Sequence, residues 1–270
     1  MEVNPKVSII VPTYNSADYL PAAMESLVGQ AYRPIEIVVI DDASTDSTSD
    51  YLNEVASCPW SHGVEFLFLR NKTNYGVGHS RNRGLMSSTG DLITYLDSDD
   101  LMLPAGIVRR VDFLRARSAE AVCARRDTYR HFEGGCRRER RNEPFENDGF
   151  GLLTTKRMQL EYLLRKRFSF GITTLLHTRA VAQTVGQFIE DKAFTGLEHY
   201  GWQLKLFHFY FVHYLEEVVL LLRRGHRVDH LASRWGESDR IRIFYQELVP
   251  RSLEELGLSL LDLDCNSEKA

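Results

Sequence analysis

The sequence predicts an α/β fold in which a mainly parallel sheet is flanked by helices. Short apolar runs rich in β-branched residues alternate with helix-like segments over about the first hundred residues. The connections between them are short, and polar residues follow most of the runs. This alternation is typical of parallel strands joined by crossover helices, and such sheets bind ligands beyond the carboxyl ends of their strands.

Four buried strands are expected in the first half of the chain. Each is a nearly continuous apolar run, as buried parallel strands are, and they cover residues 7–11, 35–40, 65–69 and 92–96. Three helices are expected between them. The first is capped by Asn15 or Ser16 and ends at Gly29, the second starts in the polar stretch 44–49, and the third runs from a glycine loop at 76–78 to about residue 86.

The second half has a less regular pattern, with more helix than strand. Helices are expected over 104–117, 155–167, 178–185, 198–209 and 239–256, and Thr178 is a cap candidate for the third. Strands are expected over 121–132, 172–176 and 218–222, and a loop over 139–151. A chain of 270 residues suits one body with an appended helical region rather than two independent domains.

The composition excludes several classes of protein. With 33 basic and 37 acidic residues the net charge is -4, which argues against a nucleic-acid binder. The four cysteines have no CxxC spacing and predict neither a disulfide framework nor a zinc site. No apolar run reaches the length of about 18 residues that a membrane span needs. We therefore expect a cytoplasmic protein with no transmembrane span.

One segment departs from this even balance of charge. Residues 101–141 hold eleven arginines, no lysine and five acidic residues, a net charge of +6. Arginine favours phosphate and carboxylate partners. The segment predicts either an ordinary solvated surface, or an anionic acceptor or a peripheral contact with the inner face of a membrane.

The most informative cluster is Asp97-Ser98-Asp99, with Asp100 directly after it. Carboxylates crowded at a strand end repel one another, and a divalent cation relieves that repulsion. Mg²⁺ and Mn²⁺ are commonly held by one or two carboxylates together with substrate phosphates. The alternative is that these acids cap the helix expected after Pro104.

Four motifs follow one another at the predicted strand ends. They are VSIIVPTYN at 7–15, VVIDDASTD at 38–46, NYGVGHSRN at 74–82 and GDLITYLDSDD at 90–100. Their order resembles that of family 2 glycosyltransferases, with a nucleotide-binding acid, a glycine loop with an Arg-Asn pair, and a DxD motif. The resemblance covers about the first 105 residues.

The resemblance implies a GT-A fold, which is Rossmann-like, and an inverting glycosyltransferase of surface-polysaccharide or glycoconjugate biosynthesis. It implies that residues 1–215 form the GT-A domain, with a nucleotide-sugar-binding half at 1–103 and an acceptor-side half at 104–215. Residues 216–270 would then be a mostly helical extension packed on the same body. The partners implied are a nucleotide-sugar donor, with UDP favoured, and a glycan, lipid-linked or small-molecule acceptor.

The family's site roles fall on particular residues. Pro12 and Tyr14 would line the base pocket, and Asp42 would accept from the base N3–H, which suits uracil. Arg81 would reach the base or the diphosphate, and Asp99 would bind Mn²⁺ or Mg²⁺ with Asp97 close to the metal and the ribose. The nucleotide-sugar site implied in this way consists of Pro12, Thr13, Tyr14, Asn15, Asp42, Asn74, Gly76, Arg81, Asp97 and Ser98.

Inversion also needs a base that deprotonates the acceptor hydroxyl. The family takes it from a Glu-Asp pair at a helix start, and here Glu198 matches the Glu while His199 stands where Asp is expected. The base therefore lies between His199 and Glu198, with Asp191 as the third candidate. The departure at His199 also leaves an alternative function, a sugar-nucleotide or glycan-binding module without catalysis.

Overall fold

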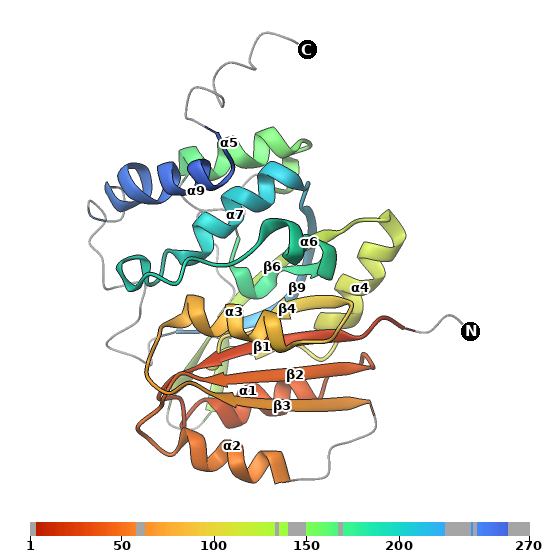
Figure 1. Ribbon diagram of the computed structural model, residues 1–270. Helices are drawn as coiled ribbons and strands as arrows, with labels where there is room; N and C mark the ends of the chain where they lie inside the picture. Colours follow the sequence, from red (N-terminus) through yellow and green to blue (C-terminus); the bar gives the residue numbers. More distant parts are fainter. Residues whose placement is uncertain are drawn as a thin grey trace.

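The computed structural model describes residues 4–57, 63–132, 135–139, 150–166, 170–224, 239 and 242–258, with the backbone alone at 130–132, 135–139, 166 and 224. Strands in this part of the chain form one sheet in the order β3-β2-β1-β4-β8-β6-β9-β5, and β7 pairs with β6 (Figure 1). The strands are β1 Val7–Thr13, β2 Ile35–Asp41, β3 Val64–Arg70, β4 Leu92–Tyr95, β5 Leu101–Met102, β6 Ala121–Phe132, β7 Gly135–Glu139, β8 Leu176–Thr178 and β9 His213–Arg224.

Helices cover both faces of this sheet (Figure 1). They are α1 Leu20–Val28, α2 Thr48–Ser57, α3 Val77–Ser87, α4 Gly106–Arg117, α5 Lys156–Lys166, α6 Arg179–Val185, α7 Glu198–Phe209 and α9 Val249–Glu255. Single turns of 3₁₀-helix occur at η1 Phe150–Leu152, η2 Ile172–Thr174 and η3 Lys192–Phe194, and a π-helical turn, η5 Phe244–Leu248, leads into α9. None of the described helices has the length and hydropathy needed to cross a membrane.

The first half of the sheet is parallel, as the sequence predicts. β1 pairs in parallel with β2 and β4, so that Val7 lies opposite both Ile35 and Leu92, and β3 extends the sheet beyond β2. Every residue of β1 and β2 is buried, which explains why their apolar runs are nearly continuous. The carboxyl ends of β1, β2 and β4 therefore share one edge of the sheet, at the left of Figure 1.

The second half of the sheet is mixed. β8 runs antiparallel to β4 and to β6, β9 runs parallel to β6, and the two-residue β5 pairs antiparallel with β9. The expectation of a mainly parallel sheet thus holds on one side of β4, while on the other side β6 and β9 form a parallel pair and the remaining pairs are antiparallel.

Successive side chains of the buried strands point to opposite faces of the sheet, so the core has two layers. Ile10 of β1 packs in the same cluster as Trp202 and Phe207 of α7, on the face that also holds residues of α6 and α9. Ile9 on the opposite face packs with Met24 of α1, together with residues of α4. α7 therefore belongs to the same face of the sheet as Ile10, together with α6 and α9.

Several predicted element boundaries differ from the structure. α1 begins at Leu20 without a side-chain cap, so the expected caps from Asn15 or Ser16 are wrong; only the Ser16 carbonyl accepts from the Leu20 N–H. Residues 172–174 form η2, and the strand expected over 172–176 begins at Leu176. The expected loop at 139–151 lies mostly outside the described residues. By contrast, Thr178 caps α6 as predicted, because its side chain accepts from the Val181 N–H.

Candidate functional site

The loops at the strand ends are tied to one another by polar side chains. Asn15 Oδ1, after β1, accepts from the Thr45 N–H after β2 at 2.8 Å. Ser16 Oγ lies 2.8 Å from Ser98 Oγ, after β4. The side chains expected to cap α1 instead hold three strand ends together, which fixes the edge where the predicted nucleotide-sugar residues gather.

Asp42 is buried at the end of β2 and organises the glycine loop. Its Oδ1 accepts from the Tyr75 N–H at 2.9 Å and from Asn71 Nδ2 at 2.7 Å, and its Oδ2 accepts from the Gly76 N–H at 2.7 Å. Gly76 has a φ of 96°, a conformation that favours glycine, and α3 starts directly after it. Asp42 therefore sets the position at which α3, and with it Arg81, enters the site.

Arg81 joins the two halves of the candidate site. Its guanidinium is buried, and it donates through Nη1 to Glu198 Oε1 at 2.7 Å and through Nη2 to Asp97 Oδ1 at 3.1 Å. Burial lowers the pKa of Arg81, but the charges of Asp97 and Glu198 outweigh it and raise the pKa above its usual value. The Arg81 guanidinium thus binds both Asp97, which follows β4, and Glu198, the first residue of α7.

The Glu198 carboxylate is ionised, and both of its oxygens accept hydrogen bonds from the protein. Burial raises the pKa of its carboxyl, but the neighbouring His199 ring and the Arg81 guanidinium lower it by more than that. The pKa of Glu198 is therefore lowered to about 2. Its second oxygen accepts from the Gly196 N–H at 2.7 Å. A carboxylate held this way is a weak proton acceptor at neutral pH, because its charge already stabilises Arg81.

The other two base candidates lie on either side of Glu198. His199 Nδ1 is 3.7 Å from Glu198 Oε1, and its side chain is 19% exposed. Asp191 Oδ1 accepts from the Ala193 N–H and so caps η3, and its other oxygen lies 3.7 Å from Arg251 Nη1. His199 is therefore next to the Arg81 network, whereas Asp191 faces α9.

Asp99 and Asp100 are held by residues of β9 and β6. Asp100 Oδ1 accepts from the Arg223 N–H at 3.0 Å, and the Asp99 carbonyl accepts from Arg223 Nε at 3.2 Å and from the Tyr129 hydroxyl at 3.3 Å. The Arg223 guanidinium lies over the rings of Tyr19 and Tyr129. The idea that these acids cap the next helix is wrong, since the N-cap of α4 is Ala105 and has no side-chain cap bond.

The acidic cluster has the character of a cation site. Burial, and then the charges of Asp99 and Asp97, raise the pKa of Asp100 well above its usual value. Asp100 Oδ2 is buried without a hydrogen-bond partner, and the Asp97 side chain is 40% exposed. Within the described residues no three His, Cys, Asp or Glu side chains enclose a metal by themselves. The residues present thus fit a metal that shares its coordination with a phosphate.

Buried polar atoms without partners concentrate at this edge. Of the four such side-chain atoms in the described part of the chain, Thr13 Oγ1, Arg81 Nε and Asp100 Oδ2 belong to the strand-end region, and the fourth is Ser252 Oγ on α9. Buried polar groups are normally hydrogen-bonded, and a ligand or ion bound at this edge would supply partners for the three atoms there. Pro12 and Thr13 are buried beside this cluster, and Tyr14 is 41% exposed.

Sequence reasoning missed several residues of this region. Lys192 Nζ donates to the Asn74 carbonyl, and Glu190 accepts from Asn82 Nδ2 at 2.8 Å and lies 2.8 Å from His79 Nδ1. These contacts fasten the loop before α7 onto the glycine loop and α3. No spacing in the sequence predicts these contacts, because the partners lie more than a hundred residues apart.

The described arginines of the +6 segment do not form one patch. Arg110 is fully buried and donates to Thr94 Oγ1 and to the Gly106 carbonyl, and burial lowers its pKa to about 9. Arg109 pairs with Glu217 at 2.7 Å, and Arg117 lies over the Phe113 ring. Arg110 thus belongs to the core, whereas the exposed Arg109 and Arg117 favour the solvated-surface interpretation for their part of the segment. The side chains of residues 130–141 lie outside the described residues.

Comparison with known proteins identifies related chains. The family model described as "Glycosyl transferase family 2" matches residues 8–183. The chain is 36% identical over 100 residues to "Glycosyltransferase GlyA" of Streptococcus pneumoniae, covering 37% of this chain and 14% of that protein. It is 36% identical over 114 residues to "Putative glycosyltransferase EpsE" of Bacillus subtilis, covering 42% and 40%. The chain thus matches less than half the length of these relatives.

Solved structures share the fold at low sequence identity. S. aureus TarS in complex with UDP-GlcNAc matches with a TM-score of 0.67 at 18% identity, over 96% of this chain and 69% of that one. The mannosyltransferase PcManGT from Pyrobaculum calidifontis, in complex with GDP-Man and Mn²⁺, matches with a TM-score of 0.62 at 20% identity, over 99% and 77%. The family match covers well over half of the chain, so the protein belongs to glycosyl transferase family 2 and has the GT-A fold.

Proposed function

We propose that the protein is a metal-dependent, inverting glycosyltransferase that moves a sugar from a UDP-sugar to a hydroxyl of an acceptor. The observation that carries the proposal is the double ion pair of Arg81 with Asp97 and Glu198. It places the residues implied for donor binding next to those implied for acceptor activation. Structural neighbours bound to UDP-GlcNAc and GDP-Man support a nucleotide sugar as donor.

Uridine recognition is assigned to Asp42 and the residues after β1. Asp42 already accepts three N–H groups, and a carboxylate offers about four lone-pair positions, so one position is left for a ring N–H. A site built around that bond disfavours bases that lack the donor. Pro12, Thr13, Tyr14 and Asn15 form the other side of this pocket in the proposal, and Asn74, Gly76 and Ser98 line it.

Asp99 and Asp97 are proposed to hold Mn²⁺ or Mg²⁺. When bound, the ion neutralises the charge that develops on the nucleoside diphosphate leaving group. Arg81 supports the same charge from the protein side, since it needs no proton transfer to do so. Tyr129 and Arg223 fix the Asp99 backbone, which limits the positions that its carboxylate can take.

His199 is the proposed base. Glu198 is committed to Arg81, and Asp191 caps η3 and faces Arg251, so neither has a carboxylate free of protein partners. The His199 ring takes the proton from the acceptor hydroxyl while that oxygen bonds to the anomeric carbon. The bond from that carbon to the diphosphate oxygen breaks with inversion, and its electron pair leaves with the diphosphate. Glu198, 3.7 Å away, stabilises the imidazolium that forms.

Donor binding and turnover are tested separately. Thermal unfolding is measured with UDP-, GDP- and dTDP-sugars in the presence of Mn²⁺, since a bound ligand raises apparent stability. Release of the nucleoside diphosphate is then followed with and without a panel of hydroxyl acceptors. Stabilisation by UDP-sugars and acceptor-dependent release of UDP support the proposal. Donor binding without release for any acceptor indicates the binding module instead, and no response to any nucleotide sugar overturns the proposal.

A further inference from the structure

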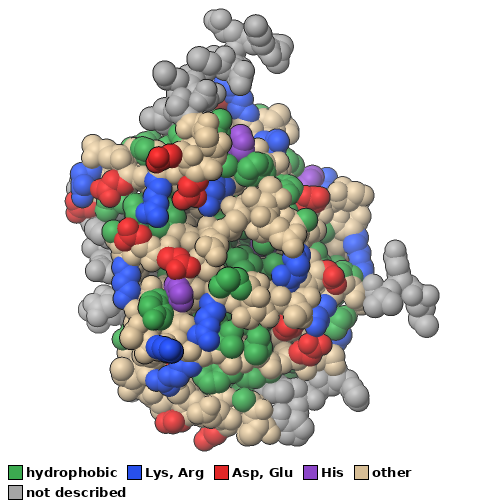
Figure 2. All heavy atoms as spheres, viewed as in Figure 1, with side chains coloured by type: hydrophobic (Ala, Val, Ile, Leu, Met, Phe, Trp, Pro, Cys, Tyr) green, Lys and Arg blue, Asp and Glu red, His purple; other side chains and the backbone are tan. Residues whose placement is uncertain are grey.

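A groove of about 620 Å³ with a mixed polar and apolar lining lies between α7, α9, the end of α6 and the residues that follow it. One wall is formed by residues 184–191, and the other by Lys205 and Phe209 of α7 with Arg251 and Glu255 of α9. This volume lies within the range of about 300–1,000 Å³ that is usual for ligand sites. Charged side chains of both signs gather on the upper left of the face in Figure 2, over these elements.

Charges alternate along the groove. Asp191 Oδ2 lies 3.7 Å from Arg251 Nη1, Arg251 Nε lies 3.9 Å from Glu255 Oε1, and Lys205 Nζ donates to Glu255 Oε2 at 2.9 Å. Glu190 adds a further carboxylate to the lining. Three carboxylates therefore face two cations, and the groove carries no excess of positive charge.

Donors in the groove are only partly used. The two Arg251 contacts are longer than a hydrogen bond, so its N–H groups have no strong acceptor among the described residues. Lys205 is 7% exposed, and its Nζ donates to the Gln187 carbonyl at 3.1 Å and to Glu255, which leaves one of its three N–H groups. Phe209 adds a ring that is 38% exposed.

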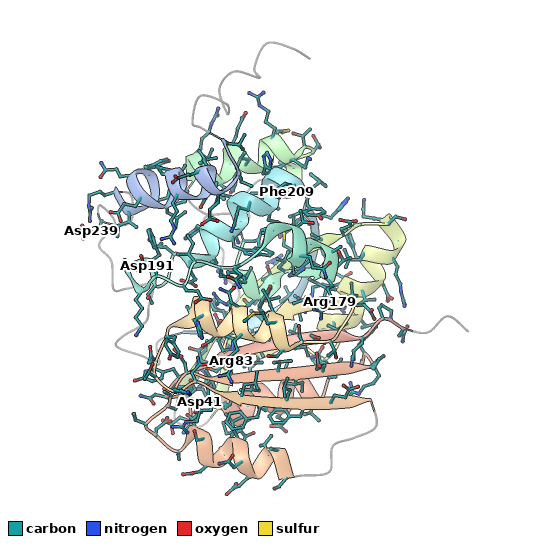
Figure 3. All side chains as sticks on the ribbon, in the orientation of Figure 1. Asp41, Arg83, Arg179, Asp191, Phe209 and Asp239 are labelled. Atoms are coloured by element: carbon teal, nitrogen blue, oxygen red, sulfur yellow. The ribbon has the colours of Figure 1, made fainter. Side chains whose placement is uncertain are left out.

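The groove is connected to the proposed reaction centre. Glu190 in its wall accepts from Asn82 Nδ2, and Asn82 follows Arg81 in α3. Asp191 lies on the same side of the molecule as Asp41 at the strand ends, and Phe209 lies farther from that edge (Figure 3). Along α7, Phe209 is about 16 Å from Glu198 at 1.5 Å per residue. The groove thus reaches from the neighbourhood of Asn82 towards the carboxyl end of α7.

We propose that this groove binds a neutral, hydroxyl-rich chain, namely the acceptor oligosaccharide. A sugar hydroxyl donates one hydrogen bond and accepts two, so each matches a neighbouring carboxylate and cation at once. The Phe209 ring provides an apolar surface for the C–H face of a sugar. An anionic chain would meet three carboxylates, and like charges brought together are costly. The proposal rests on the proposed function, because it names the acceptor class of that reaction.

Binding is tested without donor. Labelled protein is applied to immobilised neutral oligosaccharides and to acidic ones that carry uronic acid or phosphate. We expect binding to neutral chains, reduced about tenfold in Phe209→Ala by loss of the ring contact and reduced also in Arg251→Gln. The matched control is Leu152→Ala, an apolar side chain that is 79% exposed outside the groove. Thermal unfolding confirms that each variant is folded.

Three outcomes overturn the proposal. The protein binds acidic chains alone, it binds no chain, or Phe209→Ala and Arg251→Gln bind neutral chains as well as the control variant does. Release of UDP from a UDP-sugar is measured in parallel, with and without the panel of hydroxyl acceptors, and reports on donor use independently of glycan binding. UDP release without neutral-glycan binding rejects the groove and leaves the proposed function intact. Neutral-glycan binding that depends on Phe209, without any UDP release, supports the groove and rejects the catalytic proposal.

Discussion

The Arg81 guanidinium donates to the Glu198 carboxylate at 2.7 Å, and this bond joins α3 to the start of α7 across 117 residues of sequence. Both side chains are 4% exposed, so each charge depends on the other for stabilisation. Breaking a buried ion pair from one side costs about 3–5 kcal/mol, because the remaining charge is left without a partner. The pair therefore stabilises the packing of α3 against the start of α7 and is also part of the candidate site.

Glu198→Gln is expected to reduce the dependence of stability on acid pH. The pKa of Glu198 is lowered to about 2 in the folded protein, while a free glutamate titrates near about 4.3. The unfolded state binds more protons between these values, so the ionised carboxylate stabilises the fold above about pH 4.3 and this stability is lost as pH falls towards 2. The full effect is about 3 kcal/mol. Urea unfolding from pH 6 to pH 3 measures the part of this loss that falls above pH 3, about 2 kcal/mol.

Glu161→Gln serves as the control for this series, because Glu161 forms an exposed i,i+4 pair with Arg157. Exposed pairs contribute about 0–1 kcal/mol, so this variant should follow the wild-type pH profile. If Glu198→Gln kept the full wild-type loss of stability between pH 6 and pH 3, the ionised Glu198–Arg81 pair would be rejected.

Asp99→Ala is expected to remove the Mn²⁺ dependence of donor binding. The substitution takes away one proposed metal ligand and leaves the Asp99 carbonyl, with its bonds from Arg223 and Tyr129, in place. Isothermal titration of UDP with and without Mn²⁺ measures the effect, and the two affinities should converge in the variant. Asp112→Asn, which removes an exposed carboxylate on α4, is the control. Undiminished enhancement by Mn²⁺ in Asp99→Ala would contradict the metal assignment.

The strand-end half of the site could be predicted from the sequence because it is local. Each polar motif directly follows a buried apolar run, and parallel pairing of β1 with β2 and β4 brings their ends to one edge. Asp42 and Asp97 are therefore placed by strand register alone. The direction of β8 and β9 carries no comparable signal, since antiparallel and parallel neighbours both accept short apolar runs.

Partners of the predicted residues could not be predicted. The resemblance assigns Arg81 to the nucleotide base or the diphosphate, and nothing in the sequence predicts its ion pairs with Asp97 and Glu198. Arg223 lies over two tyrosine rings and holds both Asp99 and Asp100. Such contacts depend on how β9 and α7 pack against the parallel half, which a pattern along one chain does not contain.

Tyr129→Phe is expected to weaken metal-dependent donor binding. The lost hydroxyl donates to the Asp99 carbonyl at 3.3 Å and accepts from Arg223 Nε at 2.9 Å. The free energy of unfolding should fall by about 1 kcal/mol. Because Asp99 is then held less firmly, the Mn²⁺ concentration for half-maximal UDP binding should rise several-fold.

Tyr32→Phe is the matched control, because its buried hydroxyl also donates to a backbone carbonyl, that of Pro5, far from Asp99. It should lose similar stability without any change in the Mn²⁺ requirement. The same Mn²⁺ requirement in both variants would show that Tyr129 has a structural role only, and would reject it as a positioning residue for Asp99.

His199→Ala is expected to lower turnover by about 10²–10⁴ while UDP-sugar binding is retained, since general bases contribute about that much. At saturating acceptor, Asp191→Asn should leave turnover close to wild type, because its carboxylate caps η3 and faces Arg251 in the proposed acceptor groove. Glu198→Gln should lower both stability and turnover, because it leaves Arg81 without one of its two carboxylates. Single-turnover kinetics at saturating UDP-sugar separate these effects. A large loss in Asp191→Asn with normal turnover in His199→Ala would move the base to Asp191.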